Sequence, residues 1–257
     1  MTERARIVIG ADGRNSALAR SVSAPTWGLA PTVTCWYFSY YSGVDGRSLE
    51  LYVRPGRVIF VFPTNDGLVG LFVGFAIGEL ARVRADPESA VLTAADAIAG
   101  LGERIRAGRR EERFYGATQL PNFLRMPHGP GWALVGDAGC HKDPFTALGI
   151  CDALRDAELL SEALVAGLSG ERPVEEALAE YAHRRDEATL PDMGRSLAMA
   201  RFEPLSEEHL GLRAALCCDQ RATDHYLLAT QGMVAPQTFF NDENLRRIHA
   251  GAAGVSG

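Results

Sequence analysis

The hydrophobic and polar positions of the chain divide it into a β-rich part and a largely helical remainder. The β-rich part consists of segments dense in aromatic, β-branched and other apolar residues, with glycine- and proline-containing turns between them: 33–41, 49–53, 58–62 and 68–77. The turns at 54–57 and 63–67 have hairpin length. This pattern predicts an antiparallel sheet.

A helix is predicted directly after this sheet. Asp86-Pro87-Glu88 starts the helix, with acidic residues in the first turn and a proline just inside it, and the apolar spacing continues to Gly100 or beyond. This helix is expected to cover the sheet. The segment 111–118 is predicted to be one more strand, and 120–131, with three prolines and two glycines, to be a loop.

Two other segments follow a strand-loop-helix order. The apolar run 6–9 ends at Gly10-Ala11-Asp12-Gly13, and Ser16 is placed to cap a helical turn at 17–20. The second run, 132–135, is continuously apolar, as in strands buried on both faces, and ends at Gly136-Asp137.

The helix after the second run is predicted from about Ala147 to Leu168. One buried face is expected to hold five residues at helical spacing: Ile150, Leu154, Ala157, Leu160 and Leu164. The chain beyond Gly170 is predicted to be helical, with the charged run 183–187 forming a solvated face.

Composition excludes several function classes. A net charge of −6 and a pI of about 5.6 provide no general basic surface for a phosphate backbone, so no nucleic-acid partner is expected. The longest apolar stretch, 67–78, is too short and too rich in glycine to span a bilayer, so no membrane span is expected. The N-terminus lacks the hydrophobic region of a secretory signal, and a cytoplasmic location is expected.

The five cysteines are interpreted as reduced thiols, because no CxxC pair or metal-ligand spacing is present. His141, next to Cys140, is interpreted as polar packing or as a neighbour of a cofactor rather than as a metal ligand. The expected chemistry therefore lies in two segments, Gly10–Ser16 and Gly136–Leu160, whose loops follow strands at positions where α/β sheets bind ligands.

The sequence of the second loop and its helix, GDAGCHKDPFTALGICDALRDAELL, is the more specific signal. It resembles the second flavin-binding motif of the FAD-dependent aromatic-hydroxylase-like oxidoreductases, and GADGRNS resembles the other mid-chain motif of that family. The antiparallel sheet between the motifs resembles the family's inserted substrate domain. The resemblance covers nearly the whole chain.

The resemblance implies an FAD site. Asp137 would bind the ribityl chain, Gly136 and Ala138 would leave room for the pyrophosphate, and Pro144 would lie beside the isoalloxazine. The amides of Gly149 and Ile150, at a helix start, would approach the ring edge that gains negative charge on reduction. Asp12 and Gly13 would lie near the ribityl or pyrophosphate region. Leu148 stands where many members of the family have a polar residue.

One family feature is absent from this sequence. The family begins with a βαβ unit whose GxGxxG loop holds the ADP pyrophosphate, and no GxGxxG occurs here. The strands 6–9 and 132–135 would then have uncovered apolar surface. The chain is therefore expected to self-associate or to bind a partner that supplies the nucleotide-binding half, unless Met1 is a misplaced start of a longer protein.

The predicted fold class is α/β (α+β): an incomplete Rossmann-like FAD-binding domain (1–25 and 120–170), an inserted antiparallel substrate sheet (26–119) and a C-terminal helical region (171–257). The predicted function is that of an FAD-dependent, monooxygenase-like oxidoreductase reduced by NAD(P)H and acting on an apolar or aromatic small molecule.

Aromatic residues of the sheet are the expected substrate contacts: Trp36, Phe38, Tyr40, Phe60, Phe62, Phe72 or Phe75. No halogenase Trp-x-Trp-x-Ile-Pro signature is present, and no catalytic acid or base stands out. The alternative is a non-catalytic remnant that acts as a partner-binding module.

Overall fold

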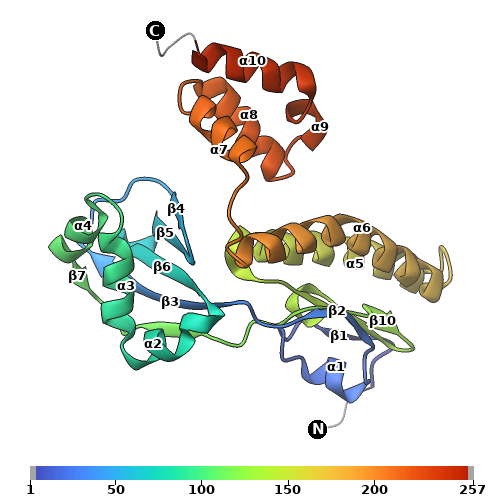
Figure 1. Cartoon of the computed structure of the whole chain (residues 1–257). Coiled ribbons are helices and arrows are strands. Elements are labelled where there is room, and N and C mark those ends of the chain that lie inside the picture. The colour runs from blue at the N-terminus through green and yellow to red at the C-terminus, as the bar shows by residue number, and fades with distance from the viewer. Residues whose placement is uncertain (1–3, 254–257) are drawn as a thin grey trace. The chain divides into compact units, whose positions relative to one another are not determined.

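The computed structural model describes residues 4–253 and divides the chain into two units, Met1–Glu203 and Pro204–Gly257 (Figure 1). Among residues 4–253, the strands all lie in the first unit, and the regular elements of the second are helices. The fold is a mixture of helices and sheets, in agreement with the predicted class.

The largest element of the first unit is a sheet of six strands. Their order is β4-β5-β6-β3-β7, with β8 also paired to β3, and every pairing is antiparallel. The strands are β3 (Thr34–Ser42), β4 (Glu50–Arg54), β5 (Arg57–Pro63), β6 (Val69–Ala76), β7 (Arg109–Arg110) and β8 (Tyr115–Ala117). The predicted antiparallel sheet is thus confirmed.

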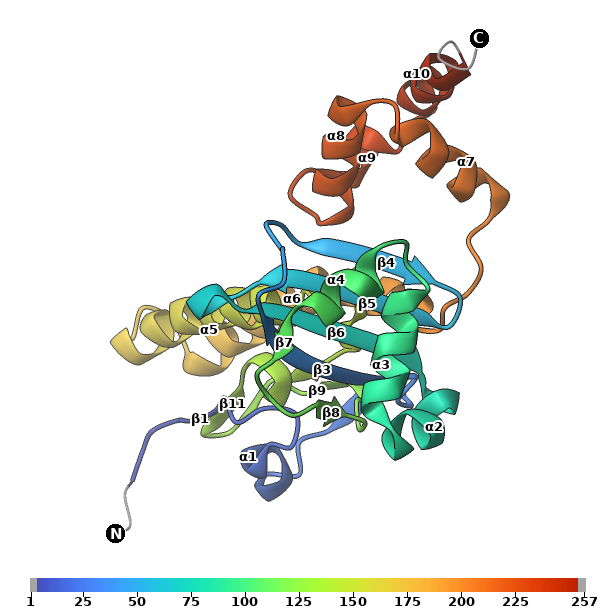
Figure 2. The same cartoon turned by 90° about the vertical axis from the view of Figure 1, so that its left-hand side faces the viewer.

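One face of this sheet is covered by helices (Figure 2). These are α2 (Leu80–Ala85), α3 (Pro87–Asp96) and α4 (Leu101–Ala107). Strand residues such as Ile59, Leu71 and Val73 are fully buried against helix residues such as Val91. Helix α3 begins as predicted, with the Asp86 carboxylate accepting from the Ser89 amide at 3.0 Å. The predicted single strand over 111–118 is wrong, because β7 and β8 are separated by four residues that belong to neither strand.

A small sheet joins the two strand-loop-helix segments. Strand β1 (Val8–Gly10) pairs in parallel with β11 (Trp132–Leu134), and β10 (His128–Gly129) pairs antiparallel with β11 on the other side. Among the described residues, β1 is an edge strand, and Val8 and Ile9 are 48% and 47% exposed. Helix α1 (Ala17–Ser21) is capped by Ser16, as predicted.

A third sheet has the order β12-β9-β2 and lies beside the loop that follows β11. Its strands are β2 (Thr26–Ala30), β9 (Asn122–Arg125) and β12 (Cys140–His141). The predicted loop over 120–131 is therefore wrong. Pro121 and Pro127 flank β9 rather than interrupt it, and Phe123 and Leu124 are buried by pairing between segments far apart in the sequence.

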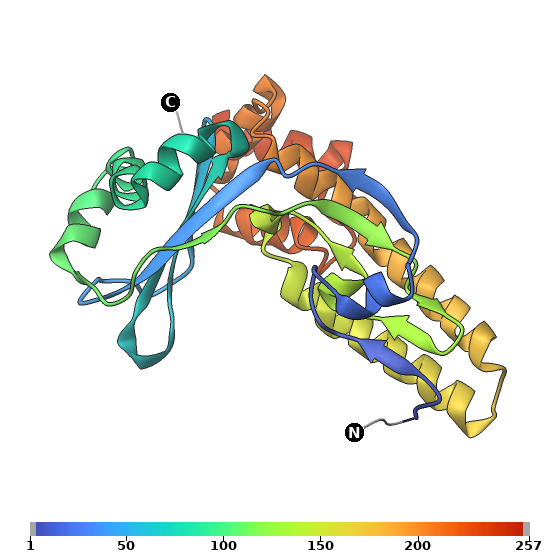
Figure 3. The same ribbon diagram turned by 90° about the horizontal axis from the view of Figure 1, so that it is seen from below.

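Two long helices, α5 (Gly149–Ser169) and α6 (Val174–Ala200), pack along each other (Figures 1 and 3). The buried side of α5 is formed by Asp156, Leu159, Leu160, Ala163 and Gly167. The predicted buried face is wrong at its start, because Ile150 and Leu154 are 77% and 68% exposed and Ala157 is also exposed. Asp156, whose charge is typical of a solvated face, lies on the buried side instead, where its carboxylate pairs with Arg155.

The charged run 183–187 is not wholly solvated. Arg185 is fully buried, donates to the Arg125 carbonyl oxygen at 3.0 Å and pairs with Asp186. The charge spacing of this run is typical of a solvated face, but one of its guanidinium groups is buried. That group provides a hydrogen-bond donor to a backbone carbonyl oxygen of β9.

The second unit is formed by α7 (Glu207–Leu216), α8 (Gln220–Thr230), α9 (Pro236–Phe239) and α10 (Asp242–Ala253). Its core gathers Leu212, Leu216, Ala229, Phe239 and Ile248. Among residues 4–253, no helix has the length and apolar character needed to cross a membrane.

Candidate functional site

The two predicted loops lie next to each other. Parallel pairing aligns Gly10 with Leu134, and the Val135 amide then donates to the Gly10 carbonyl oxygen at 3.0 Å. Each loop therefore leaves the carboxyl end of its strand at the same edge of the sheet. This is the edge at which α/β sheets bind ligands.

Arg125 ties the two loops together. Its guanidinium donates to the Ala138 carbonyl oxygen at 2.9 Å and to the Arg14 carbonyl oxygen at 3.1 Å, and it stacks over the Phe123 ring. Burial, with repulsion from Arg20, lowers the pKa of this group. The sequence analysis did not identify Arg125, because it assigned 120–131 to a loop. Without strand β9, the direction of this side chain could not be predicted.

Asp12 and Gly13 lie in the first loop. The Asp12 carboxylate accepts from the Ala17 amide at 2.6 Å and from the Leu18 amide at 3.4 Å, so it binds the start of α1. Hydrogen bonding by Ser16, more than by these amides, lowers the pKa of Asp12. Gly13 has φ of +74°, a conformation that favours glycine. Both residues thus shape the loop around the helix start.

Gly136, Asp137 and Ala138 form the 3-10 turn η3 (Gly136–Ala138). Gly136 has φ of +59°, and a Cβ there would lie 3.2 Å from the Ala153 Cβ in α5. Ala138 is fully buried. The Asp137 side chain is exposed and has no hydrogen-bond or ion-pair partner among residues 4–253. An unpartnered carboxylate at a strand's carboxyl end is well placed to accept from ligand hydroxyls.

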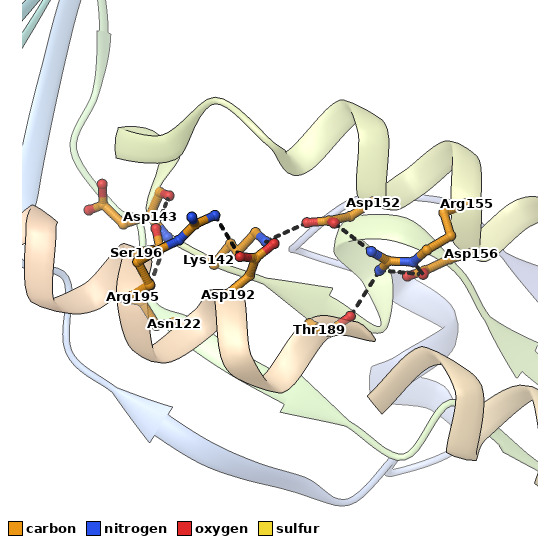
Figure 4. A network of polar contacts seen from close by, with 10 residues as sticks. All are labelled: Asn122, Lys142, Asp143, Asp152, Arg155, Asp156, Thr189, Asp192, Arg195 and Ser196. Carbon is orange, nitrogen blue, oxygen red and sulfur yellow. Dashed lines mark hydrogen bonds and ion pairs between the residues drawn. The ribbon is translucent and has the colours of Figure 1, made fainter. Parts of the chain in front are cut away.

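The loop after η3 is held by polar contacts at Lys142 and Asp143 (Figure 4). The Asp143 amide donates to Asn122 Oδ1 at 2.7 Å, and its carbonyl oxygen accepts from Ser196 Oγ at 2.9 Å. Its carboxylate accepts from Thr34 Oγ1 and from the Phe145 amide. Burial raises the pKa of Asp143, and these two contacts partly offset that rise. One acidic residue therefore joins β9, α6, β3 and its own loop.

Lys142 anchors the same loop to both long helices (Figure 4). Its side chain is 5% exposed, and Nζ lies 2.6 Å from Asp152 Oδ2 in α5 and 3.8 Å from Asp192 Oδ2 in α6. Nζ meets no acceptor with good hydrogen-bond geometry among the described residues. The attraction between the close charges is therefore what chiefly offsets the desolvation of this buried ammonium.

Asp152 and Asp192 each bind an arginine as well. Arg155 donates to Asp152 at 2.9 Å, to Asp156 and to Thr189 in α6, and Arg195 pairs with Asp192 at 2.7 Å. Sequence reasoning missed this network, because spacing along a single helix does not show which residues of α6 face α5. The network holds the loop rigidly against the start of α5.

Helix α5 begins where this loop ends. Leu148 occupies its cap position and provides no side-chain acceptor. Gly149 and Ile150 are exposed, and a Cβ at Gly149 would meet no atom within 4 Å among the described residues. Pro144 is exposed, while its neighbour Phe145 is buried. The first N–H groups of α5 therefore face open space with the positive end of the helix dipole behind them.

The aromatic residues predicted to contact substrate divide between the two faces of the six-stranded sheet. Phe75 is wrong as a candidate, because it is buried under the helices on the other face. Trp36 and Phe60 are buried beside Phe145. Four residues stay half-buried on the face away from α2–α4: Phe38, Tyr40, Phe62 and Phe72.

These half-buried rings form one connected platform. Phe38 stacks on Phe72 at 4.3 Å between ring centroids and on Tyr115 at 5.4 Å, and Phe62 lies 5.1 Å from Phe72. Gly70 and Gly74 occupy alternate positions of β6, where a Cβ would collide with neighbouring rings. The strand sequence thus makes room for large flat side chains.

The Cys140-His141 pair has structural contacts. Burial raises the pKa of the Cys140 thiol to about 12, so the thiolate needed for nucleophilic or metal chemistry is scarce at neutral pH. His141 is buried, and its Nδ1 lies 2.5 Å from the Pro121 carbonyl oxygen. Within the described residues, no group of His, Cys, Asp or Glu side chains fits a metal ion.

Sequence comparison finds relatives among proteins named digeranylgeranylglycerophospholipid reductases. The chain is 27% identical over 216 residues to a digeranylgeranylglycerophospholipid reductase of Methanosarcina acetivorans, covering 80% of this chain and 51% of that protein. It is 29% identical over 190 residues to such a reductase of Methanococcoides burtonii, covering 71% and 44%. The chain thus spans about half the length of the curated relatives it matches. No family profile matches it.

Solved structures with the same fold are flavin-dependent enzymes. PqsL, a probable FAD-dependent monooxygenase from Pseudomonas aeruginosa, matches with a TM-score of 0.66 and 25% identity over 77% of this chain and 56% of that chain. The myxobacterial halogenase CndH, a variant of the FAD-dependent halogenases, matches with a TM-score of 0.68 and 16% identity, covering 98% and 62%. The chain therefore has the fold of FAD-dependent monooxygenases and halogenases.

Proposed function

We propose that this chain, a relative of the FAD-dependent oxidoreductases of the aromatic-hydroxylase-like type, binds FAD at its paired loops and forms part of an oxidoreductase. The observation that carries the proposal is the meeting of the two loops at one sheet edge, tied by Arg125, beside the uncapped start of α5. Loops at the carboxyl ends of parallel strands and helix N-termini are the usual places for phosphates and for rings that gain negative charge.

The proposed roles follow from the position of each residue. Asp137, exposed and without a partner among residues 4–253, would accept from the ribityl hydroxyls. Gly136 and Ala138 would let the backbone approach the pyrophosphate.

At the other end of the loop, the amides of Gly149 and Ile150 would stabilise negative charge on the ring, and Pro144 would lie beside it. Asp12 and Gly13 would support the pyrophosphate side through the shape of their loop rather than through the Asp12 carboxylate, which already binds α1. Arg125 and the network around Lys142 and Asp143 would hold both loops in place.

When bound, FAD would supply the redox chemistry, with NAD(P)H as the proposed electron donor and monooxygenation of an apolar or aromatic small molecule as the proposed reaction. The platform of Phe38, Phe62 and Phe72 is the proposed substrate surface. Phe145 links it to the flavin loop, because Phe145 packs in the same cluster as Phe62 and Phe72. The reductase names of the curated relatives favour reduction of an apolar chain as the second candidate reaction.

The chain is further proposed to act in association, either with another copy or with a segment that supplies the nucleotide-binding half. Strand β1 supports this, since its outer edge pairs with no described strand and Val8 and Ile9 are about half exposed on opposite faces. Parallel strands are usually covered on both faces, so β1 has the character of a strand inside a larger sheet.

Fluorescence titration with FAD tests the proposed site through Asp137→Asn. Loss of a charge-assisted hydrogen bond should raise the FAD dissociation constant roughly tenfold. Asp66→Asn is the matched control, because Asp66 is an exposed aspartate in the turn between β5 and β6, away from the two loops. Equal FAD affinity of the wild type and Asp137→Asn would show that Asp137 does not bind the cofactor. Failure of the wild-type chain to bind would favour the partner-binding module.

A further inference from the structure

Helix α6 ends in a strained turn. Arg201 is its C-cap, and the next residue, Phe202, has φ of +56°, in the left-handed region that favours glycine. The Phe202 amide donates to the Met199 carbonyl oxygen at 3.0 Å, which fixes the turn. A bulky side chain is sterically unfavourable in this region, because its Cβ crowds the backbone. Among the described residues, the other non-glycine residues with positive φ have smaller side chains: Ser23, Asp66 and Ala147.

Other helix ends in this chain use glycine in the same conformation. Helix α8 has Gln231 as its C-cap, and the next residue, Gly232, has φ of +72° and donates its amide to the Ala229 carbonyl oxygen at 3.3 Å. Helix α5 ends at Gly170, with φ of +82°. The turn alone therefore favours glycine at position 202, and the benefit of Phe202 has to come from its ring.

The ring of Phe202 lies where the loop before α5 meets the platform. It contacts Phe145 edge-to-face, with 5.5 Å between the ring centroids. Phe145 is buried, and its amide donates to the Asp143 carboxylate at 3.1 Å, so the partner ring is firmly held. Phe202 also packs against the same buried cluster as Phe62 and Phe72 of the platform. Because Phe202 is only half-buried, part of its ring stays accessible beside these half-buried rings.

We infer that Phe202 is a specificity-determining residue, which forms the wall of the substrate surface at the end nearest the loop before α5. Its ring fills space that a larger apolar substrate needs, and the fixed turn keeps the ring in one place. The inference rests on the proposed role of the platform as the substrate surface. It adds the residue that limits the size of the substrate at this end of the surface.

The neighbours of Phe202 make size, rather than charge, the property that it selects. Met199 and Ala200, in the last turn of α6, belong to the same apolar cluster, as does Trp36 of β3. A smaller apolar residue at position 202 therefore changes the room at the wall without changing its charge. An apolar wall discriminates between ligands through the volume that it leaves open.

Competition for a neutral fluorescent probe tests the inference without FAD. N-phenyl-1-naphthylamine is bound to the wild-type chain and displaced by naphthalene or by the larger pyrene. In Phe202→Ala the affinity for pyrene relative to naphthalene should rise roughly tenfold, because the missing ring leaves room for the larger ligand. Phe114→Ala is the matched control and should leave this ratio unchanged, since Phe114 is also half-buried but packs with the helix-covered core of the sheet.

Phe202→Gly is the second variant. It should change the ratio as Phe202→Ala does, and it should unfold at a higher temperature than Phe202→Ala, because glycine adopts positive φ without the steric conflict. An unchanged ratio in both variants, with circular dichroism showing that they are folded, would overturn the role of Phe202. Equal or lower thermal stability of Phe202→Gly would overturn the argument that the turn itself favours glycine.

Phe72→Ala separates this inference from the proposed function. It should weaken the binding of both ligands several-fold, because it removes a ring of the platform. If it does so while the Phe202 variants keep the wild-type ratio, the substrate surface stands and the role of Phe202 fails. If Phe72→Ala binds both ligands as the wild type does, or the wild type binds neither, the platform is not the substrate surface and the inference fails with it. FAD titration reports on the cofactor site separately.

Discussion

The six-stranded sheet and the parallel pair β1–β11 use similar apolar residues, but they differ in how completely those residues are covered. On the helix-facing side of the large sheet, Ile59, Leu71 and Val73 are fully buried, whereas Val8 and Ile9 of β1 are about half exposed. The large sheet therefore contains its own hydrophobic core. In the parallel pair, Ala133 and Leu134 of β11 are fully buried, contrary to the expected exposure of 132–135, and β1 is the strand that lacks cover among the described residues. Apolar strand sequence alone therefore does not reveal how much protein surrounds a strand.

The largest expected effect lies in the covered sheet. Phe75→Ala removes a ring that is 1% exposed beneath the helices, and it should lower the free energy of unfolding by about 3–5 kcal/mol through lost burial and a cavity. Urea denaturation followed by circular dichroism measures this. A loss below about 1 kcal/mol would show that this core is loosely packed.

Lys142→Met should have the next largest effect, at the junction of the loop with α5 and α6. It leaves Asp152 and Asp192 without their shared cation, at a cost of about 2–3 kcal/mol, which is below that of a fully buried pair because both carboxylates are partly exposed. The double variant Lys142→Met/Asp152→Asn should recover part of the loss in the same denaturation experiment. If the double variant loses as much unfolding free energy as Lys142→Met and Asp152→Asn together, there is no coupling energy between Lys142 and Asp152.

Asp143 links stability to pH. Because burial raises its pKa above the ordinary value of 3.8, the folded state binds this proton more tightly than the unfolded state. The stability that the group contributes is present below the unfolded pKa and is lost as pH rises through the raised folded pKa. Asp143→Asn avoids that loss, so its stability relative to wild type should improve as the pH rises above about 4. An offset that stays constant with pH in urea denaturation would contradict this.

The smallest expected effect lies in the half-exposed strand β1 and sharpens the comparison. Ile9→Ala should change the unfolding free energy of the isolated monomer by less than about 0.5 kcal/mol, since half of the side chain is already in water. Thermal unfolding at low protein concentration measures it. A loss comparable to that of Phe75→Ala would mean that β1 is covered in solution.

Local sequence patterns predicted much of the fold but not the contacts between distant segments. The hairpin turns, the helix start at Asp86-Pro87-Glu88 and the Ser16 cap depend on neighbouring residues and agree with the structure. Strand β9 and the exposed start of α5 were not predicted. Pairing of β9 with β2 and β12, and the fit of α5 against α6, depend on residues far away in the sequence.

The same limit applies to the candidate site. The two loops could be found from their glycines and aspartates, and the resemblance to flavoproteins gave them a role. The residues that fix them, Arg125 and Lys142, lie outside any short motif, because their contacts reach other elements. Phe75 was misplaced because alternation along a strand separates two faces without showing which one the helices cover.

The central claim, that the paired loops bind FAD, is tested most directly by the visible absorbance spectrum of the 257-residue chain after incubation with excess FAD and desalting. The account predicts a retained flavin band in the wild type and in Asp66→Asn, and a much weaker band in Asp137→Asn. A wild-type chain that leaves the column without flavin absorbance would contradict the claim that these two loops suffice to hold the cofactor.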